Sequence, residues 1–131
     1  MPTSYSLLLV DDEVELLRIF SRRFERRGYA VTAVDHPSLA EEAVRQTEFH
    51  VAVLDRTLRE RDGLELMQSL HRIAPDLQVI VLSGHSGHEA ERAAFERGAY
   101  AYLTKPCRLD RLEATILRAC EHREPIGMGV K

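Results

Sequence analysis

The sequence has few cysteines, and this excludes several classes of small protein. Only Cys107 and Cys120 are present, and their spacing matches no metal-ligand pattern. A small domain held together by disulfides needs more cysteines, and a structural zinc site needs its cysteines only a few residues apart. We therefore expect neither a disulfide framework nor a zinc site.

Long hydrophobic runs and an excess of positive charge are also missing. No apolar stretch approaches the roughly 20 residues that cross a bilayer, and the first ten residues lack the pattern of a secretory signal. Basic residues number 18 against 21 acidic ones, for a formal net charge of −3. A protein without an excess of positive charge is poorly suited to bind the negatively charged backbone of a nucleic acid. We expect a cytoplasmic protein that binds neither a membrane nor nucleic acid directly.

What the sequence does contain is enough apolar material for one core. Its 131 residues are 44% hydrophobic and 30% charged, which fits a single compact domain and argues against disorder. Periodicity is lost near the end of the chain. We therefore predict one domain over residues 1–124, followed by a flexible tail or the start of a linker over residues 125–131.

Strand-like and helical patterns alternate along the whole chain. The short apolar runs are mostly unbroken, as in strands buried on both faces, and they comprise Leu7–Val10, Val31–Val34, Val51–Leu54, Val79–Leu82 and Tyr100–Leu103. Segments with helical period separate them. Five such alternations predict an α/β fold with a parallel sheet and helices on both faces.

The helix boundaries carry recognisable signals. Gly28 follows the first periodic segment and suits a left-handed helix end. Ser38 with Glu41, and Ser86 with Glu89, have the spacing of capping boxes, which predicts helix starts there. Two further helices are expected from Gly63 to about Arg72 and from Arg108 to about Glu121.

Reactive side chains follow four of the five strand-like runs. The first run ends in Asp11-Asp12 and the third in Asp55, while Ser83 and Lys105 follow the last two. Ligand sites of open α/β sheets lie at the carboxyl ends of the strands. Three carboxylates in one small volume repel one another unless a cation neutralises them. Mg²⁺ is the natural cation, because it binds few carboxylates and bridges to phosphate oxygens.

The rarity of lysine makes Lys105 informative. Sixteen of the 18 basic residues are arginine, and position 105 is nevertheless lysine. A compact ammonium group approaches a phosphoryl group or carboxylate as a point charge, whereas a guanidinium imposes a planar geometry. Lys105 is therefore a candidate member of the site.

These motifs together resemble the receiver domain of bacterial two-component response regulators, including the single-domain chemotaxis regulator. The resemblance covers approximately residues 6–123 and rests on four motifs in order: Leu-Leu-Val-Asp11-Asp12, Val-Leu-Asp55 with Asp62-Gly63, Leu82-Ser83-Gly84, and Gly98-Ala-Tyr-Ala-Tyr102-Leu-Thr-Lys105-Pro106. It implies a flavodoxin-like, doubly wound three-layer α/β/α fold, with a five-stranded parallel sheet in the order 2-1-3-4-5.

The resemblance also implies a chemistry for the acidic residues. Asp55 would accept a phosphoryl group from a histidine of a sensor kinase or phosphotransfer protein, forming an acyl phosphate. Asp12 would bind Mg²⁺ directly and Asp11 mainly through water, with Asp55 and the main-chain carbonyl of Thr57 as further ligands. Lys105 would stabilise the charge that develops during transfer. On this reading the protein catalyses only its own phosphorylation and dephosphorylation.

Two residues would convert phosphorylation into a signal. By resemblance, the Ser83 hydroxyl donates to a phosphoryl oxygen, an interaction to which the Gly84 N–H adds, and the Tyr102 ring swings inward as Ser83 moves. The altered face would comprise residues 86–97 and 99–118. This face would contact a downstream protein or a fused output domain, and homodimerisation through it is one option.

Positions near Asp55 and Ser83 also suggest how the signal is timed. By resemblance, Thr57 and His85 tune the lifetime of the phosphoryl group, so changing either should alter its decay without abolishing phosphorylation. The loop after Asp55 departs from the family, because Arg59 stands where proline is usual. The arginines of this loop could attract a phosphodonor, pair with Glu60 and Asp62, or contact a partner.

Three other functions are compatible with part of the pattern. A phosphotransferase of the haloacid-dehalogenase type also uses an aspartyl nucleophile and Mg²⁺, but it needs a second aspartate where Thr57 stands. A flavodoxin-like FMN module needs a glycine- or hydroxyl-rich phosphate loop, where this chain has Asp11-Asp12. A receiver-like scaffold that works without phosphorylation is the third alternative.

Overall fold

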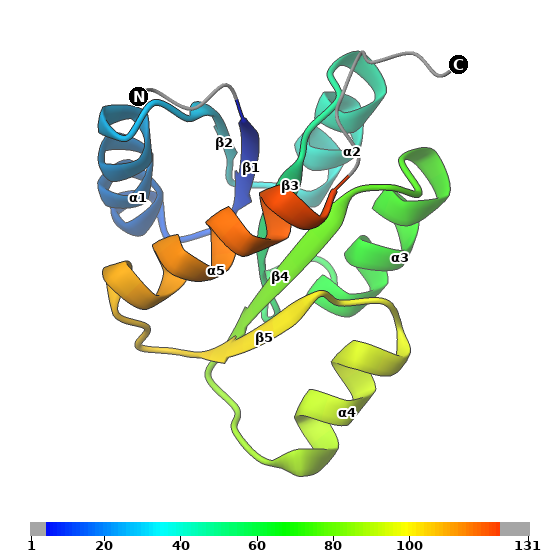
Figure 1. Cartoon of the computed structure of the whole chain (residues 1–131). Helices are drawn as coiled ribbons and strands as arrows, with labels where there is room; N and C mark the ends of the chain where they lie inside the picture. The colour runs from blue at the N-terminus through cyan, green and yellow to red at the C-terminus, as the bar shows by residue number, and fades with distance from the viewer. Residues whose placement is uncertain (1–4, 124–131) are drawn as a thin grey trace.

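The computed structural model describes residues 5–123 and contains one five-stranded parallel sheet (Figure 1). The strand order is β2-β1-β3-β4-β5, which confirms the predicted order and the doubly wound α/β class. The strands are β1 (Ser6–Val10), β2 (Ala30–Val34), β3 (Val51–Asp55), β4 (Gln78–Ser83) and β5 (Ala101–Thr104). The 125–131 tail prediction lies outside the described residues.

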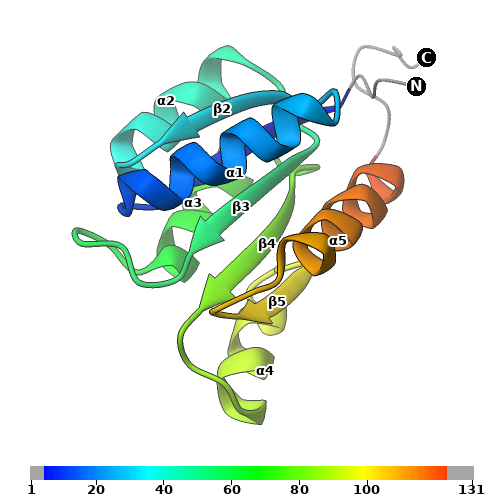
Figure 2. The same cartoon turned by 90° about the vertical axis from the view of Figure 1, so that its left-hand side faces the viewer.

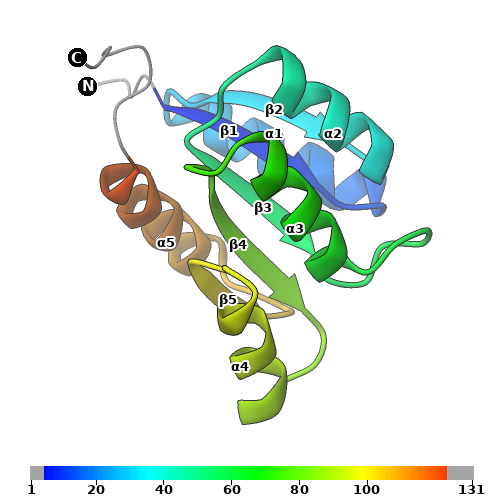
Figure 3. The same ribbon diagram turned by 90° about the vertical axis from the view of Figure 1, so that its right-hand side faces the viewer.

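Five helices cover the two faces of the sheet. They are α1 (Val14–Arg26), α2 (Pro37–Gln46), α3 (Gly63–Ile73), α4 (His88–Glu96) and α5 (Leu109–His122). One buried cluster joins the sheet to α1 and α5, and a second joins it to α2, α3 and α4. Figure 1 shows α5 in front of the strands, and Figure 3 shows α3 and α4 from the right.

The central strands are buried as predicted, but β2 is not. All five residues of β3 are buried, whereas β2 has no buried residue and lies at the edge of the sheet. The prediction that Val31–Val34 is buried on both faces was therefore wrong. An edge strand has one neighbouring strand instead of two, so its side chains are less completely covered.

Both predicted capping boxes were also wrong. The N-cap residue of α2 is His36 and not Ser38, and the His36 side chain accepts a hydrogen bond from the Ser38 N–H. The N-cap residue of α4 is Gly87 and not Ser86, so no side chain caps that helix. The ends of α1 and α3 are close to the prediction, and Gly28 has the expected positive φ of 95°.

The parallel register brings the functional side chains to one edge. Val10 pairs with Leu54, and Asp55 pairs with Leu82, so the carboxyl ends of β1, β3 and β4 are level. Figure 2 shows the strand arrowheads pointing to the lower left, away from the end of α5. We call this the carboxyl edge of the sheet.

The two ends of the described chain meet at the opposite edge. The Ser6 N–H donates to the His50 Nδ1 over 3.0 Å, and the Arg123 Nε donates to the Phe49 carbonyl over 3.4 Å. Both contacts are made to the residues just before β3. No helix of the described residues is long and apolar enough to cross a membrane.

Candidate functional site

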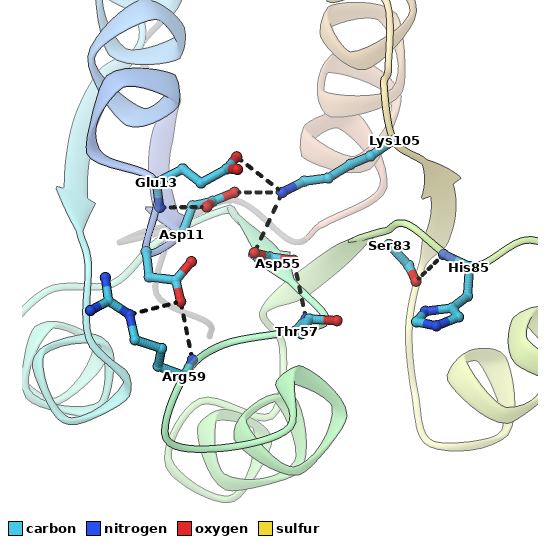
Figure 4. A network of polar contacts seen from close by, with 9 residues as sticks. Asp11, Glu13, Asp55, Thr57, Arg59, Ser83, His85 and Lys105 are labelled. Carbon is cyan, nitrogen blue, oxygen red and sulfur yellow. Dashed lines mark hydrogen bonds and ion pairs between the residues drawn. The ribbon is translucent and has the colours of Figure 1, made fainter.

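Three aspartates converge at the carboxyl edge. Asp11 and Asp12 follow β1, Asp55 ends β3, and one carboxylate oxygen from each lies within 4.8 Å of the others. Asp11 and Asp55 are only 4% and 6% exposed, while Asp12 is half-buried. Figure 4 shows the Asp11 and Asp55 side chains close together, with Lys105 beside both. The sequence prediction that residues 11, 12 and 55 would meet agrees with this placement.

Lys105 lies over the same cluster. Its Nζ is 3.1 Å from Asp11 Oδ2 and 3.4 Å from Asp55 Oδ2. A third carboxylate, Glu13 Oε1, lies 3.7 Å away on the solvent side. Burial opposes the charged form of Lys105, but the charge and hydrogen bond of Asp11 outweigh it and raise the lysine pKa. Lys105 is therefore a fixed cation among carboxylates.

The carboxyl group of Asp55 has a raised pKa despite this cation. Burial is the main cause, and the charge of Asp11 adds to it. The Thr57 N–H, which donates to Asp55 Oδ1 over 3.1 Å, and Lys105 both act in the opposite direction. The charged carboxylate is thus incompletely compensated, which favours a further cation beside it.

The donor set suits Mg²⁺ in particular. Asp11, Asp12 and Asp55 each offer a carboxylate oxygen, and these oxygens lie within 4.8 Å of one another. Hard oxygen ligands of this kind match Mg²⁺, and no sulfur or imidazole belongs to the group. The residues present therefore fit the metal that the sequence predicts.

Gly63 lets the polypeptide approach the phosphoacceptor candidate closely. A Cβ at this position would lie 2.4 Å from the Asp55 carbonyl oxygen and 2.7 Å from the Arg56 Cα. The Gly63 N–H donates to the Arg56 carbonyl over 2.7 Å, and Asp62 caps α3 by accepting from the Leu64 N–H. This turn returns the chain to the sheet directly beneath Asp55.

Ser83 and Tyr102 are joined through the main chain of His85. The fully buried Ser83 Oγ accepts from the His85 N–H over 3.0 Å, and the Tyr102 hydroxyl donates to the His85 carbonyl over 2.5 Å. Figure 4 shows the Ser83 hydroxyl directed toward His85. Tyr102 is 8% exposed, so its side chain is largely buried in this structure.

Thr57 and His85 line the same groove beside Asp55. The groove has a volume of about 930 Å³ and runs between the loop after β3 and the start of α4. Arg56, Asp62 and His88 also contribute to its walls. Both Thr57 and His85 are exposed, so their side chains are accessible to solvent from this groove.

The arginines after Asp55 make contacts that the sequence analysis did not find. Arg59 contacts Asp12: its N–H donates to Asp12 Oδ2 over 3.1 Å, and its Nε lies 3.5 Å from that oxygen. Arg61 pairs with Glu41 in α2 over 2.8 Å. Only Arg56 approaches the expected partner Asp62, at 3.9 Å. No local sequence pattern connects residue 59 with residue 12, since loop geometry decides the contact.

The family model and the relatives found by comparison with known proteins agree on one family. The family model described as "Response regulator receiver domain" matches residues 7–117. The alginate biosynthesis transcriptional regulatory protein AlgB of Pseudomonas putida is 33% identical over 118 residues, which cover 90% of this chain and 26% of the relative. This chain thus spans about a quarter of the length of the curated relatives that it first matches.

Solved structures give the same result for the fold. A CheY-like receiver domain from Methanospirillum hungatei superposes with a TM-score of 0.87 at 24% identity, covering 93% of this chain and 98% of that one. A Burkholderia pseudomallei response regulator matches with a TM-score of 0.81 at 27% identity, covering 91% and 70%. The latter structure is described as containing a phosphorylated aspartic acid, a calcium ion and citrate.

Proposed function

Because the chain belongs to the receiver domains of two-component response regulators, we propose that it accepts a phosphoryl group on Asp55 in a Mg²⁺-dependent reaction. The observation that carries the proposal is the convergence of Asp11, Asp12 and Lys105 around Asp55 at the carboxyl edge. The donor would be a phosphohistidine of a sensor kinase or phosphotransfer protein.

The transfer is a substitution at phosphorus. A carboxylate oxygen of Asp55 forms the new P–O bond while the P–N bond to the donor histidine breaks and its electron pair returns to the imidazole. Asp12, Asp55 and the Thr57 carbonyl, with Asp11 acting through water, would hold Mg²⁺, which would supply positive charge to the phosphoryl oxygens. Lys105, already 3.4 Å from Asp55, adds a second positive charge on the same group.

The neighbouring residues orient the nucleophile. The Thr57 N–H and the Lys105 ammonium each bind one carboxylate oxygen of Asp55, which fixes the plane of the group. Burial limits the water that competes for it. Thr57 and His85, which line the adjacent groove, are proposed to set how quickly water removes the phosphoryl group.

Signal output would proceed through Ser83, Gly84 and Tyr102. A phosphoryl oxygen that accepts from the Ser83 hydroxyl and the Gly84 N–H draws Ser83 away from the His85 N–H. Because Tyr102 binds the carbonyl of that same residue, the rearrangement reaches β5. Phosphorylation then favours the active arrangement only by binding it more tightly than the inactive one.

The proposal extends to partners and location. The face formed by α4, β5 and α5 would act on a downstream protein or a fused output domain, with homodimerisation as one mode. We propose no catalysis beyond the protein's own phosphorylation and dephosphorylation, no direct contact with nucleic acid or membrane, and a cytoplasmic location shared with the kinase. A phosphorylation-independent scaffold is the alternative.

The test is labelling by a small-molecule phosphodonor, read by intact mass. We expect the wild-type protein to gain one phosphoryl group with Mg²⁺ and none with a chelator. Asp55→Asn should gain none, while Asp76→Asn, an exposed aspartate outside the site, should behave as wild type. An unlabelled wild-type protein, or labelling that persists in Asp55→Asn, would favour the scaffold or another acceptor.

A further inference from the structure

The loop between β3 and α3, residues 56–62, is tied down at several points. Glu60 Oε1 lies 2.9 Å from His36 Nε2, and Arg61 contacts Glu41 over 2.8 Å. Just before these two residues, Arg59 lies against Asp12. The loop therefore holds one permanently charged guanidinium beside a carboxylate of the candidate metal site.

Both the main chain and the side chain of Arg59 contact the same carboxylate oxygen of Asp12. Its N–H and Nε lie 3.1 Å and 3.5 Å from Asp12 Oδ2. Figure 4 shows the Arg59 guanidinium on the opposite side of the site from Lys105. The three clustered carboxylates are thus flanked by two cations that belong to the chain itself.

We propose that Arg59 is an internal competitor of Mg²⁺ for Asp12, and this inference rests on the metal site of the proposed function. Lys105 and Arg59 already offset much of the charge of the carboxylates. A doubly charged ion beside Asp12 is repelled by the Arg59 guanidinium, so the ion binds better when the guanidinium turns away. Arg59 thereby lowers the affinity of the site for Mg²⁺.

The side chain of Arg59 can leave Asp12 and return to it readily. It is 81% exposed, whereas the Asp12 side chain is 18% exposed, so water receives the guanidinium at small cost. The contact of Glu60 with His36 and the main-chain bridge between Thr57 and Asp62 keep the loop in place when Arg59 moves. Because the loop stays anchored, the guanidinium competes at a high effective concentration.

The size of the effect follows from the exposure of the pair. Exposed ion pairs change an equilibrium by roughly 1.4- to 5-fold. We therefore expect Arg59→Gln, which removes the charge and keeps the N–H, to tighten Mg²⁺ binding roughly two- to fivefold at low salt. Added salt should reduce the difference, because it screens the Arg59 charge in the wild-type protein.

The experiment is calorimetric titration of the whole chain with MgCl₂. Arg61→Gln is the matched control, since it removes the same charge from the same loop but from Glu41 instead of Asp12. We expect Arg61→Gln and the charge-preserving Arg59→Lys to retain the wild-type dissociation constant. Circular dichroism would verify that each variant is folded.

The outcomes separate this inference from the proposed function. Equal tightening in Arg59→Gln and Arg61→Gln would assign the effect to overall charge and overturn the proposal, as would weaker binding in Arg59→Gln. If the wild type binds Mg²⁺ and Arg59→Gln binds it equally, the competitor role fails while the metal site stands. If no variant binds Mg²⁺, the metal site itself is refuted.

Discussion

At the scale of single residues, the side chains that form the candidate site at the carboxyl edge lower the stability of the folded protein. Asp55 is buried beside Asp11, and its raised pKa means that the folded state favours the neutral acid. The stabilising contribution of this group is complete at low pH and is lost as the pH rises through the folded-state pKa. At neutral pH, the metal-free protein therefore carries a destabilising charge.

We predict that Asp55→Asn stabilises the metal-free protein at pH 7. The neutral amide has the shape of the carboxyl group and removes the buried charge, while Lys105 keeps Asp11 as a partner at 3.1 Å. Substitutions of this kind at functional sites commonly increase the free energy of unfolding by about 0.5–2 kcal/mol. Urea unfolding in a chelator measures the change.

A matched surface substitution and a change of pH control this prediction. Asp76→Asn should leave the free energy of unfolding within about 0.5 kcal/mol of wild type. The advantage of Asp55→Asn should shrink in acid, where the wild-type carboxyl group is also neutral. A metal-free Asp55→Asn protein that is less stable than wild type at pH 7 would contradict the assignment.

The meeting of residues 11, 12, 55 and 105 was predictable because each follows a strand, and parallel strands end at one edge. The contacts of Glu13 and Arg59 were not. They depend on the path of two loops, and a charged loop residue has no periodicity from which its partner can be inferred. Arg59 was visible in the sequence only as a charged residue in an unusual position.

At the scale of elements, the turn from β3 into α3 determines where Asp55 points. Its narrowest point is Gly63, where a side chain would collide with the main chain of Asp55 and Arg56. Both neighbours are backbone atoms, so neither can turn aside as a flexible side chain would. A side chain at this position would therefore push the end of β3 and the start of α3 apart.

We predict that Gly63→Ala destabilises the protein and slows phosphorylation. Crowding of this kind costs about 1–3 kcal/mol in the free energy of unfolding, and the forced shift moves the end of β3 that carries Asp55. Gly84→Ala is the control, because a Cβ there meets nothing within 4 Å. Equal free energies of unfolding in the two variants would show that the turn accommodates a side chain without strain.

The starts of α2 and α4 show why the capping-box patterns predicted the wrong N-cap residues. Ser38 and Glu41 have capping-box spacing, yet Glu41 contacts Arg61 and Ser69 in distant segments. His36 takes the capping role at α2, and Gly87 occupies the corresponding position at α4. The contacts of Glu41 with these distant segments thus outweigh the local preference for a capping box, which contributes about 1 kcal/mol to helix stability.

At the scale of the whole molecule, the two edges of the sheet have different tasks. The carboxyl edge carries the charged cluster, while the opposite edge closes the fold through His50, which precedes β3. His50 is buried, its Nδ1 accepts from the Ser6 N–H, and its ring contacts Tyr5. Burial, assisted by the charge of Arg123, lowers the pKa of the imidazole.

We predict that His50 makes the fold sensitive to mild acid. A lowered folded-state pKa means that its contribution is complete above the ordinary value of 6.5 and is lost as the pH falls through the folded-state pKa. Protonated Nδ1 cannot accept from Ser6, and the unpaired buried donor costs about 1–3 kcal/mol. Urea unfolding at pH 7.5 and 5.5 measures the loss.

Two histidine substitutions isolate this effect from other titrating groups. His50→Asn should reduce the difference between the two pH values, because no group at that position then titrates. His88→Asn, at an exposed position on α4, should keep the wild-type difference. Identical pH dependence in both variants would assign the acid sensitivity to other residues.

The fold as a whole followed from the alternation of apolar runs and helical segments, since parallel strands with crossover helices leave few topologies. The exposure of β2 did not follow, because an apolar run looks alike at the centre and at the edge of a sheet. The domain limits, the cytoplasmic location and the absence of nucleic-acid contact stay predictions.

The meeting of both described ends beside Phe49 and His50 has a practical consequence. A fluorescent label attached at a described end, Tyr5 or Arg123, would lie at the opposite end of the strands from Asp55, which closes β3. The proposed kinase contact at Asp55 would then stay accessible in a protein immobilised at that position. Surface-based measurement of kinase affinity should therefore give the same value from either orientation of attachment.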